Sequence, residues 1–192
     1  MSAFDIKAYG PVFKSLLKPR NNIMALDSGI ENSSARLGLE NLDLDKAFSP
    51  DIIIDRRMAE GCRSGLWLFH NFLTISHTIS QTIETPTGSY WHGIMHRREP
   101  DYPNGKYWFD RVGEHAIYQV LKDEAAAIAT GTENLPDEAA FLTTQTRWDP
   151  FAFIDLCEVS LSSKLPVANV CLSIQQREWE LLFEYSYRKA IS

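Results

Sequence analysis

The chain has 192 residues, of which 44% are hydrophobic and 23% are charged, and these values are ordinary for one soluble globular domain. Its formal net charge of −6 argues against a nucleic-acid-binding protein, because contacts with phosphates need a basic surface. The cysteines are scattered and form no zinc or disulfide pattern, which is typical of reduced thiols. The N-terminus lacks the basic start and the apolar stretch of a signal peptide, so we expect a cytoplasmic protein.

The N-terminal part, residues 1–48, has the least regular pattern in the chain. Apolar residues spaced for a short helix over 4–17 are interrupted at Gly10. The segment 18–41 is rich in Asn, Ser and Gly, and this composition predicts a long loop that wraps the body of the protein. The helical body is expected to occupy residues 49–192.

The segment 65–83 contains no Asp, Glu, Lys or Arg, although many of its residues are polar. A helix that faces water normally carries charges, and a helix inside a core is normally apolar all round. Its apolar residues recur every three or four positions, so the segment is predicted to form one buried helix. On the opposite side, His70, Thr74, His77 and Gln81 form a polar stripe. Because buried polar groups need partners, we expect this stripe to line an internal network or a ligand cavity. So polar a segment is not expected to span a membrane.

The rest of the body also has a helical pattern. Ser49 and Pro50 are typical of a helix start, and Ser89 is a candidate cap for another helix. No repeat, linker or strand alternation is present, so the sequence predicts one all-α domain, a helical bundle over 1–192. Helices are predicted over 50–63, 90–98, 106–112, 114–129, 137–146, 150–161 and 166–190, with a turn-rich connection over 101–105. The last helix is amphipathic, and its inward face is expected to hold Val170, Ile174, Trp179, Leu182 and Phe183.

All 5 histidines lie between positions 70 and 115. His92 and His96 are one helical turn apart, a spacing that lets two imidazoles bind one ion of Zn, Fe, Ni or Mn. His77 is the expected third ligand, with His70 as the alternative. Glu99 shares the face of His96, but it reaches the same ion only if the chain folds back after the helix. No HExxH or other sharp metal signature is present, so the alternative is a metal-free hydrogen-bond network among these histidines and neighbouring polar side chains.

Charged and aromatic residues are concentrated after His92. The adjacent Arg97 and Arg98 can grip a carboxylate or phosphate, while aromatic rings enclose the apolar remainder of a ligand. The alternative is that the arginines pair with nearby carboxylates and that the rings belong to the core. The predicted catalytic residues are His77, His92, His96 and Glu99, and the predicted ligand-binding residues are His70, Gln81, Trp91, Arg97, Arg98, Asp101, Lys106 and Trp108.

The stretch from His70 to Val112 contains the strings SHTISQ and TPTGSYWHGIMHRREPD, and it resembles a family of uncharacterised microbial proteins that share this segment. That resemblance implies kinship and no particular reaction. A looser likeness is to the DinB/YfiT-like helical bundles, which bind a metal through three histidines, two of them in an HxxxH pair. This likeness implies that His92 and His96 are the pair and that His77 or His70 is the third ligand. The chain departs from these bundles in its length and in its aromatic, Arg-rich continuation, so the likeness concerns the fold alone.

These patterns predict a helical bundle with an enclosed polar pocket that binds a small polar or anionic molecule. In the enzymatic version of this hypothesis, His92 or His96 is a general base or metal ligand, His77 is its partner, and the arginines hold the anion. Such groups suit hydrolysis or a lyase-type proton transfer. The rival hypothesis is a non-catalytic interaction or scaffold protein whose histidines form a structural hydrogen-bond network. Both hypotheses allow a homodimer through the last helix.

Overall fold

In the computed structural model, which describes residues 4–18, 24–163 and 167–192, all regular structure is helical, as the sequence predicts. No helix in these ranges has both the length and the apolar character that a membrane crossing requires. The α-helices are α1 (Gly10–Leu16), α2 (Ser33–Glu40), α3 (Leu44–Phe48), α4 (Arg56–Phe69), α5 (Leu73–Ser80), α6 (Pro86–Arg98), α7 (Tyr102–Val112), α8 (Tyr118–Thr130), α9 (Phe141–Thr144), α10 (Pro150–Ser163) and α11 (Ala168–Ala190), and two 3-10 helices are η1 (Ile6–Tyr9) and η2 (Asp137–Ala139).

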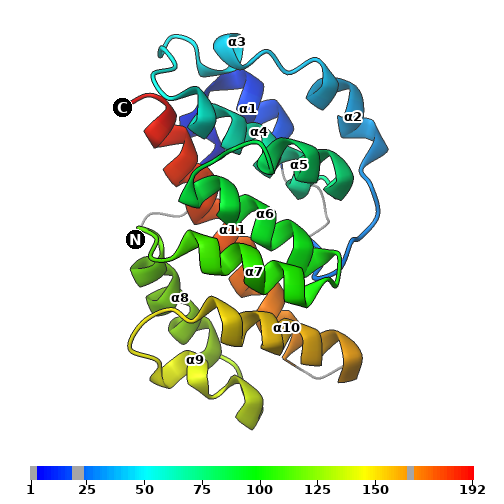
Figure 1. The fold of residues 1–192 in the computed structure, drawn as a ribbon, viewed down its shortest axis with the longest axis vertical. Coiled ribbons are helices and arrows are strands. Elements are labelled where there is room, and N and C mark those ends of the chain that lie inside the picture. The colour runs from blue at the N-terminus through cyan, green and yellow to red at the C-terminus, as the bar shows by residue number, and fades with distance from the viewer. Residues whose placement is uncertain (1–3, 19–23, 164–166) are drawn as a thin grey trace.

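Figure 1 shows α6 and α7 side by side across the middle of the molecule, with α1 to α5 above them and α8 to α10 below. The long helix α11 runs behind this arrangement and packs against α4, α8 and α10. The residues predicted for the inward face of the last helix are all buried. Its expected start at Pro166 lies outside the described residues.

The N-terminal part is more regular than its composition predicts. Helix α2 lies within the segment expected to be a loop, of which residues 19–23 are outside the described ranges. The helix expected to start at Pro50 begins instead after Asp55. The Asp55 carboxylate accepts hydrogen bonds from the backbone N–H groups of Arg57 and Met58, at 2.9 and 3.4 Å. An aspartate that satisfies two free N–H groups in this way is a strong helix cap.

The uncharged segment 65–83 forms two helices, not the one helix that its spacing predicts. Between α4 and α5, Asn71 has a φ of 65°, in the left-handed region that Asn tolerates better than most residues. The Arg98 guanidinium donates hydrogen bonds to the Leu68 carbonyl at 2.7 Å and to Asn71 Oδ1 at 2.5 Å. These bonds satisfy the end of α4 and fix the break. Therefore His70 and His77 are not on one helix face.

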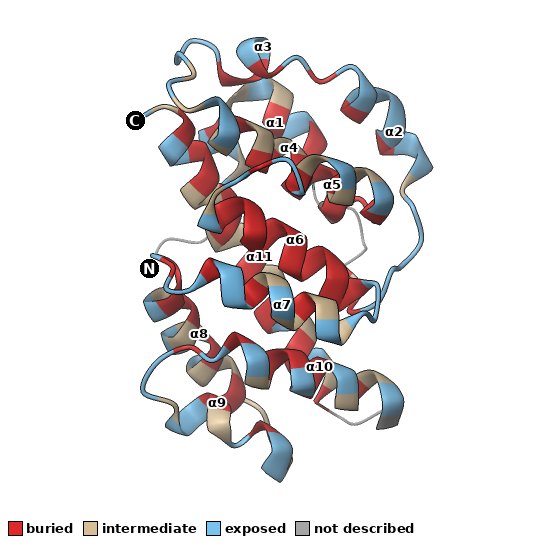
Figure 2. Ribbon diagram, viewed as in Figure 1, coloured by how far each residue is buried: buried red, intermediate tan, exposed pale blue. Residues whose placement is uncertain are grey.

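Helix α6 lies at the centre of the bundle, and every residue in 87–98 is buried (Figure 2). It packs against α4, α5 and α7. A Cβ atom at Gly93 would lie 2.7 Å from Phe109 Cδ2 of α7, so glycine at this position allows the two helices to approach closely. Polar side chains on α6 are consequently held inside the protein, where each needs a partner.

Two helices begin earlier than the sequence predicts. Thr85 Oγ1 accepts a hydrogen bond from the Gly88 N–H at 3.0 Å, so Thr85 and not Ser89 caps α6. Asp101 accepts one from the Asn104 N–H at 3.3 Å, so the connection expected there is the first turn of α7 instead. Farther along, α8 starts later than predicted, and the helix expected over 137–146 is divided into η2 and α9.

A fully buried ion pair joins α6 to α11. Arg97 Nη2 lies 2.5 Å from Glu178 Oε2, and neither side chain has any exposed surface. Arg97 Nη2 also donates to Gln175 Oε1 at 3.3 Å, and Tyr90 Oη donates to Glu178 Oε1 at 3.0 Å. Because a buried charge is tolerated only when it is paired, this network fixes how α6 is seated on α11.

Candidate metal centre

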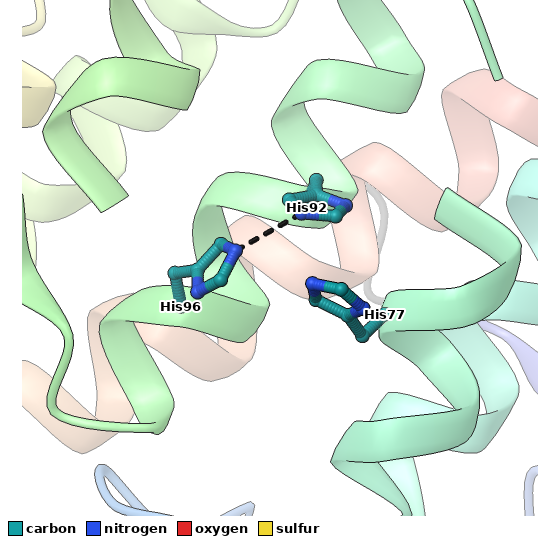
Figure 3. Close-up of side chains that lie close together, drawn as sticks. All are labelled: His77, His92 and His96. Carbon is teal, nitrogen blue, oxygen red and sulfur yellow. Dashed lines mark hydrogen bonds between the residues drawn. The ribbon is translucent and has the colours of Figure 1, made fainter. Parts of the chain in front are cut away.

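Three histidines meet at one point between α5 and α6 (Figure 3). His77 comes from α5, and His92 and His96 come from successive turns of α6. One ring nitrogen of each lies within 4.8 Å of the other two, and His92 Nε2 is 3.0 Å from His96 Nε2. The structure thus brings together the three histidines that the sequence predicts as metal ligands.

The outer nitrogen of each α6 histidine has its own hydrogen-bond acceptor. Ser80 Oγ lies 2.9 Å from His92 Nδ1 and donates its proton to the His77 carbonyl at 3.2 Å, so its oxygen is left to accept from His92. Glu99 Oε2 lies 3.4 Å from His96 Nδ1, and a carboxylate can only accept. With these acceptors, both rings can carry their proton on Nδ1, and in that tautomer two unprotonated Nε2 atoms face each other; in the other tautomer, one Nε2 donates to the second across 3.0 Å. Metal-binding histidines are typically oriented by outer acceptors of this kind.

Both α6 histidines are uncharged at neutral pH. Burial, with smaller effects of His96 and His77, lowers the pKa of His92 to about 3. Burial also lowers the pKa of His96, against the opposing effect of Glu99. The neutral imidazole is the form that binds a metal ion, so these two ligands need not lose a proton to do so.

The distance between the inner nitrogens fits a single ion. Imidazole nitrogens lie about 2.0–2.1 Å from Zn²⁺, so two of them in the tetrahedral arrangement that zinc prefers are about 3.3–3.4 Å apart. His92 Nε2 and His96 Nε2 lie 3.0 Å apart, so the two rings need to move apart by only a few tenths of an ångström. The half-buried His77 ring completes the set by a shift of roughly 1–2 Å, and three protein ligands leave a coordination position open.

Helix α7 forms part of the surroundings of the three histidines. The Trp108 ring packs against His92, with 4.0 Å between the ring centroids. The Asn104 side-chain nitrogen lies 3.2 Å from His96 Nε2 and 3.4 Å from His96 Nδ1. An amide N–H can only donate, so Asn104 can donate to whichever nitrogen of this ring is unprotonated.

Other predicted ligand-binding residues lie elsewhere. His70 is buried, but its Nε2 is 2.8 Å from the Leu16 carbonyl, so it joins α4 to α1 and is not part of the cluster of three. Trp91 is fully buried and donates to Ser186 Oγ at 3.2 Å. Lys106 pairs with a carboxylate of α10 at 2.5 Å. All three side chains thus make contacts within the protein.

Arg97 and Arg98, the predicted anion clamp, are both fully buried. Arg97 is paired with Glu178 as described above, and Arg98 donates to the backbone carbonyls of Asp27 and Leu68 at 3.2 and 2.7 Å. Their charges are used to join helices and to end α4. Their sequence signal, two adjacent arginines near aromatic rings, fits this structural role as well as it fits ligand binding.

Comparisons with protein families, curated proteins and solved structures found no significant match for this chain. The site is therefore interpreted from its own chemistry. The sequence patterns do not single out Ser80 or Asn104 as partners of these histidines. One signal points to Asn104 in hindsight: it lies three residues after Asp101, the spacing of a capped first helical turn.

Proposed function

We propose that the protein is a metal-dependent enzyme of the hydrolase or lyase type, whose divalent ion is held by His77, His92 and His96. The observation that carries this proposal is the pair of inward-facing Nε2 atoms 3.0 Å apart, on two rings whose outer Nδ1 atoms each lie within reach of an acceptor. Two lone pairs at this distance repel each other unless a cation or a proton lies between them. A metal ion satisfies both, and His77 as well.

Among divalent ions, the ligand set favours those that prefer imidazole. Zn, Fe, Ni and Mn sites all use histidine, whereas Mg and Ca prefer oxygen ligands. When bound with an open position, such an ion lowers the pKa of a coordinated water to about 7 and polarises a substrate carbonyl or phosphoryl oxygen.

Two carboxylates at the edge of the cluster are placed to move protons. Glu99 and Asp101 lie 3.4 and 3.9 Å from His96 Nδ1, and their side chains are 38% and 48% exposed. They can therefore hold the Nδ1 proton of His96 and exchange protons with solvent. Glu99 thus orients a ligand in this proposal instead of binding the ion itself.

The rival function, a scaffold with a structural histidine network, is favoured by one contact. The 3.0 Å between His92 Nε2 and His96 Nε2 is also a hydrogen-bond distance. In that arrangement, one Nε2 carries a proton and donates it to the other, and no ion is needed. The two functions differ in what the removal of one imidazole does.

The test is metal content after reconstitution with Zn, Fe, Ni or Mn. We expect one equivalent in the wild-type protein and less than a tenth of it in His92→Ala and His96→Ala. His115→Gln is the matched control, because His115 is also buried but lies outside the cluster, and this variant should keep the ion. Full metal content in His92→Ala would contradict the proposal. A metal-free wild-type protein whose melting temperature drops sharply in these variants would establish the scaffold instead.

A further inference from the structure

A groove of about 670 Å³ lies beside the histidine cluster, between the end of α5, the start of α6 and one face of α7. This volume is in the range of small-molecule sites, roughly 300–1,000 Å³. Trp108 lines the groove and also packs against His92 with 4.0 Å between ring centroids. Trp108 therefore contacts both the groove and one histidine of the candidate metal centre.

Ser89 supplies an unused polar group to this groove. It is only 7% exposed and lines the groove, and among the described residues its hydroxyl makes no hydrogen bond. Ser89 Oγ is not among the fully buried, unpaired side-chain atoms of the described residues, so this hydroxyl is accessible from the groove. A ligand oxygen in the groove would satisfy it.

The groove also holds a guanidinium without a counter-ion. Arg111 lies over the rings of Trp108 and Tyr107, at 5.4 and 5.9 Å from their centroids. In the described part of the chain, no carboxylate forms an ion pair with it. Stacking on aromatic rings holds an arginine in place and leaves its N–H groups free for a planar or tetrahedral oxyanion.

The start of α6 adds a third favourable element. Thr85, the N-cap of α6, lines the groove with Ser89, so the positive end of the helix dipole faces the same space. Glu84 is the opposing element, since its carboxylate also lines the groove. The wall therefore carries one full positive and one full negative charge, with the helix end favouring an anion.

We propose that this groove binds the anionic oxygen group of a small substrate, a phosphate ester or a carboxylate, and so holds the substrate beside the metal centre. Its role as a substrate site rests on the proposed function, but the binding of an oxyanion does not. Arg111 thus takes the part that the sequence assigns to Arg97 and Arg98. Gln81, predicted to bind ligand, lines the same groove.

The first experiment titrates metal-free, ¹⁵N-labelled protein with inorganic phosphate, and separately with acetate, at constant ionic strength. We expect saturable NMR shift changes at the Ser89 amide and the Arg111 Nε–H. Arg111→Gln should weaken phosphate binding at least tenfold and Ser89→Ala about threefold, whereas Glu84→Gln should tighten it. The control is Arg147→Gln, because Arg147 is an exposed arginine that lines a different cavity.

Unchanged phosphate affinity in Arg111→Gln, with wild-type shifts elsewhere in the spectrum, would overturn the proposal. The proposal would also be overturned if chloride caused the same NMR shift changes as phosphate, or if the shift changes occurred at residues far from Ser89. Comparison of phosphate with acetate shows which oxyanion the groove prefers.

The second experiment tests the link to the metal centre. In protein loaded with Mn²⁺, the ³¹P signal of bound phosphate should broaden in the wild type and not in Arg111→Gln, while both keep the same metal content. If the protein binds phosphate but takes up no metal on reconstitution, the proposed function is wrong and the oxyanion site remains. If the protein takes up the metal but binds no phosphate, the oxyanion site is wrong and the proposed metal centre remains.

Discussion

Removal of the Glu178 carboxylate should destabilise the protein strongly, because it leaves Arg97 as a charge inside the core. Both side chains are fully buried and 2.5 Å apart. In Glu178→Leu, only the Gln175 oxygen, at 3.3 Å, remains to accept from Arg97 Nη2, and Tyr90 Oη loses its acceptor. Breaking one side of a buried pair costs about 3–5 kcal/mol. For a chain of this size, that corresponds to a fall in melting temperature of roughly 10 °C.

The assay is urea unfolding, with a double variant and a surface control. Arg97→Met combined with Glu178→Leu should recover much of the loss, since an apolar replacement of both partners leaves no buried charge. Glu184→Leu, which breaks an exposed ion pair with Arg188 on the same helix, should cost less than about 1 kcal/mol. A loss below about 1 kcal/mol in Glu178→Leu, or a double variant no better than the single one, would refute this reasoning.

Two further predictions concern stability. Burial lowers the pKa of His115 to about 4 in the folded protein, so its contribution to stability is complete above pH about 6.5, the unfolded pKa, and is lost as the pH falls through 4. The loss is about 3 kcal/mol. Urea unfolding at several pH values should show that the free energy of unfolding falls less steeply with acid in His115→Gln than in the wild type. The same pH dependence in both proteins would contradict this. Gly93→Ala should cost about 1–3 kcal/mol, because its Cβ would lie 2.7 Å from Phe109. Gly131→Ala, with its nearest contact at 3.5 Å, should be neutral or stabilising in the same melting experiment, and equal losses in the two variants would argue against the close approach of α6 and α7.

The sequence predicts the helical class and the histidine pair because both depend on local spacing. His92 and His96 are one turn apart on any helix. The absence of charge in 65–83 correctly marks a buried end of α4, but the predicted inward polar stripe is wrong for Thr74 and Gln81, which are exposed on and after α5. The sequence does not decide between His70 and His77 as the third histidine, because the two would lie on the same face of a continuous helix. Only the break at Asn71 separates them, and that break depends on Arg98, which is distant in sequence.

The roles of the arginines are determined by contacts that no local pattern contains. Arg97 is buried because Glu178, on the last helix, lies opposite it. Arg111, by contrast, is exposed and stacked on Trp108, and its sequence neighbours give no indication of the groove. Pairing between distant residues thus decides which cation is structural and which is available to a ligand.

X-ray absorption of the reconstituted protein tests the central claim most directly, because it reports the atoms bound to the ion. We expect one equivalent of metal with three imidazole nitrogens at about 2.0–2.1 Å in the wild type, and the loss of this imidazole signal in His92→Ala. An ion without imidazole neighbours, or the same three-imidazole spectrum in His92→Ala, would contradict a metal centre at His77, His92 and His96.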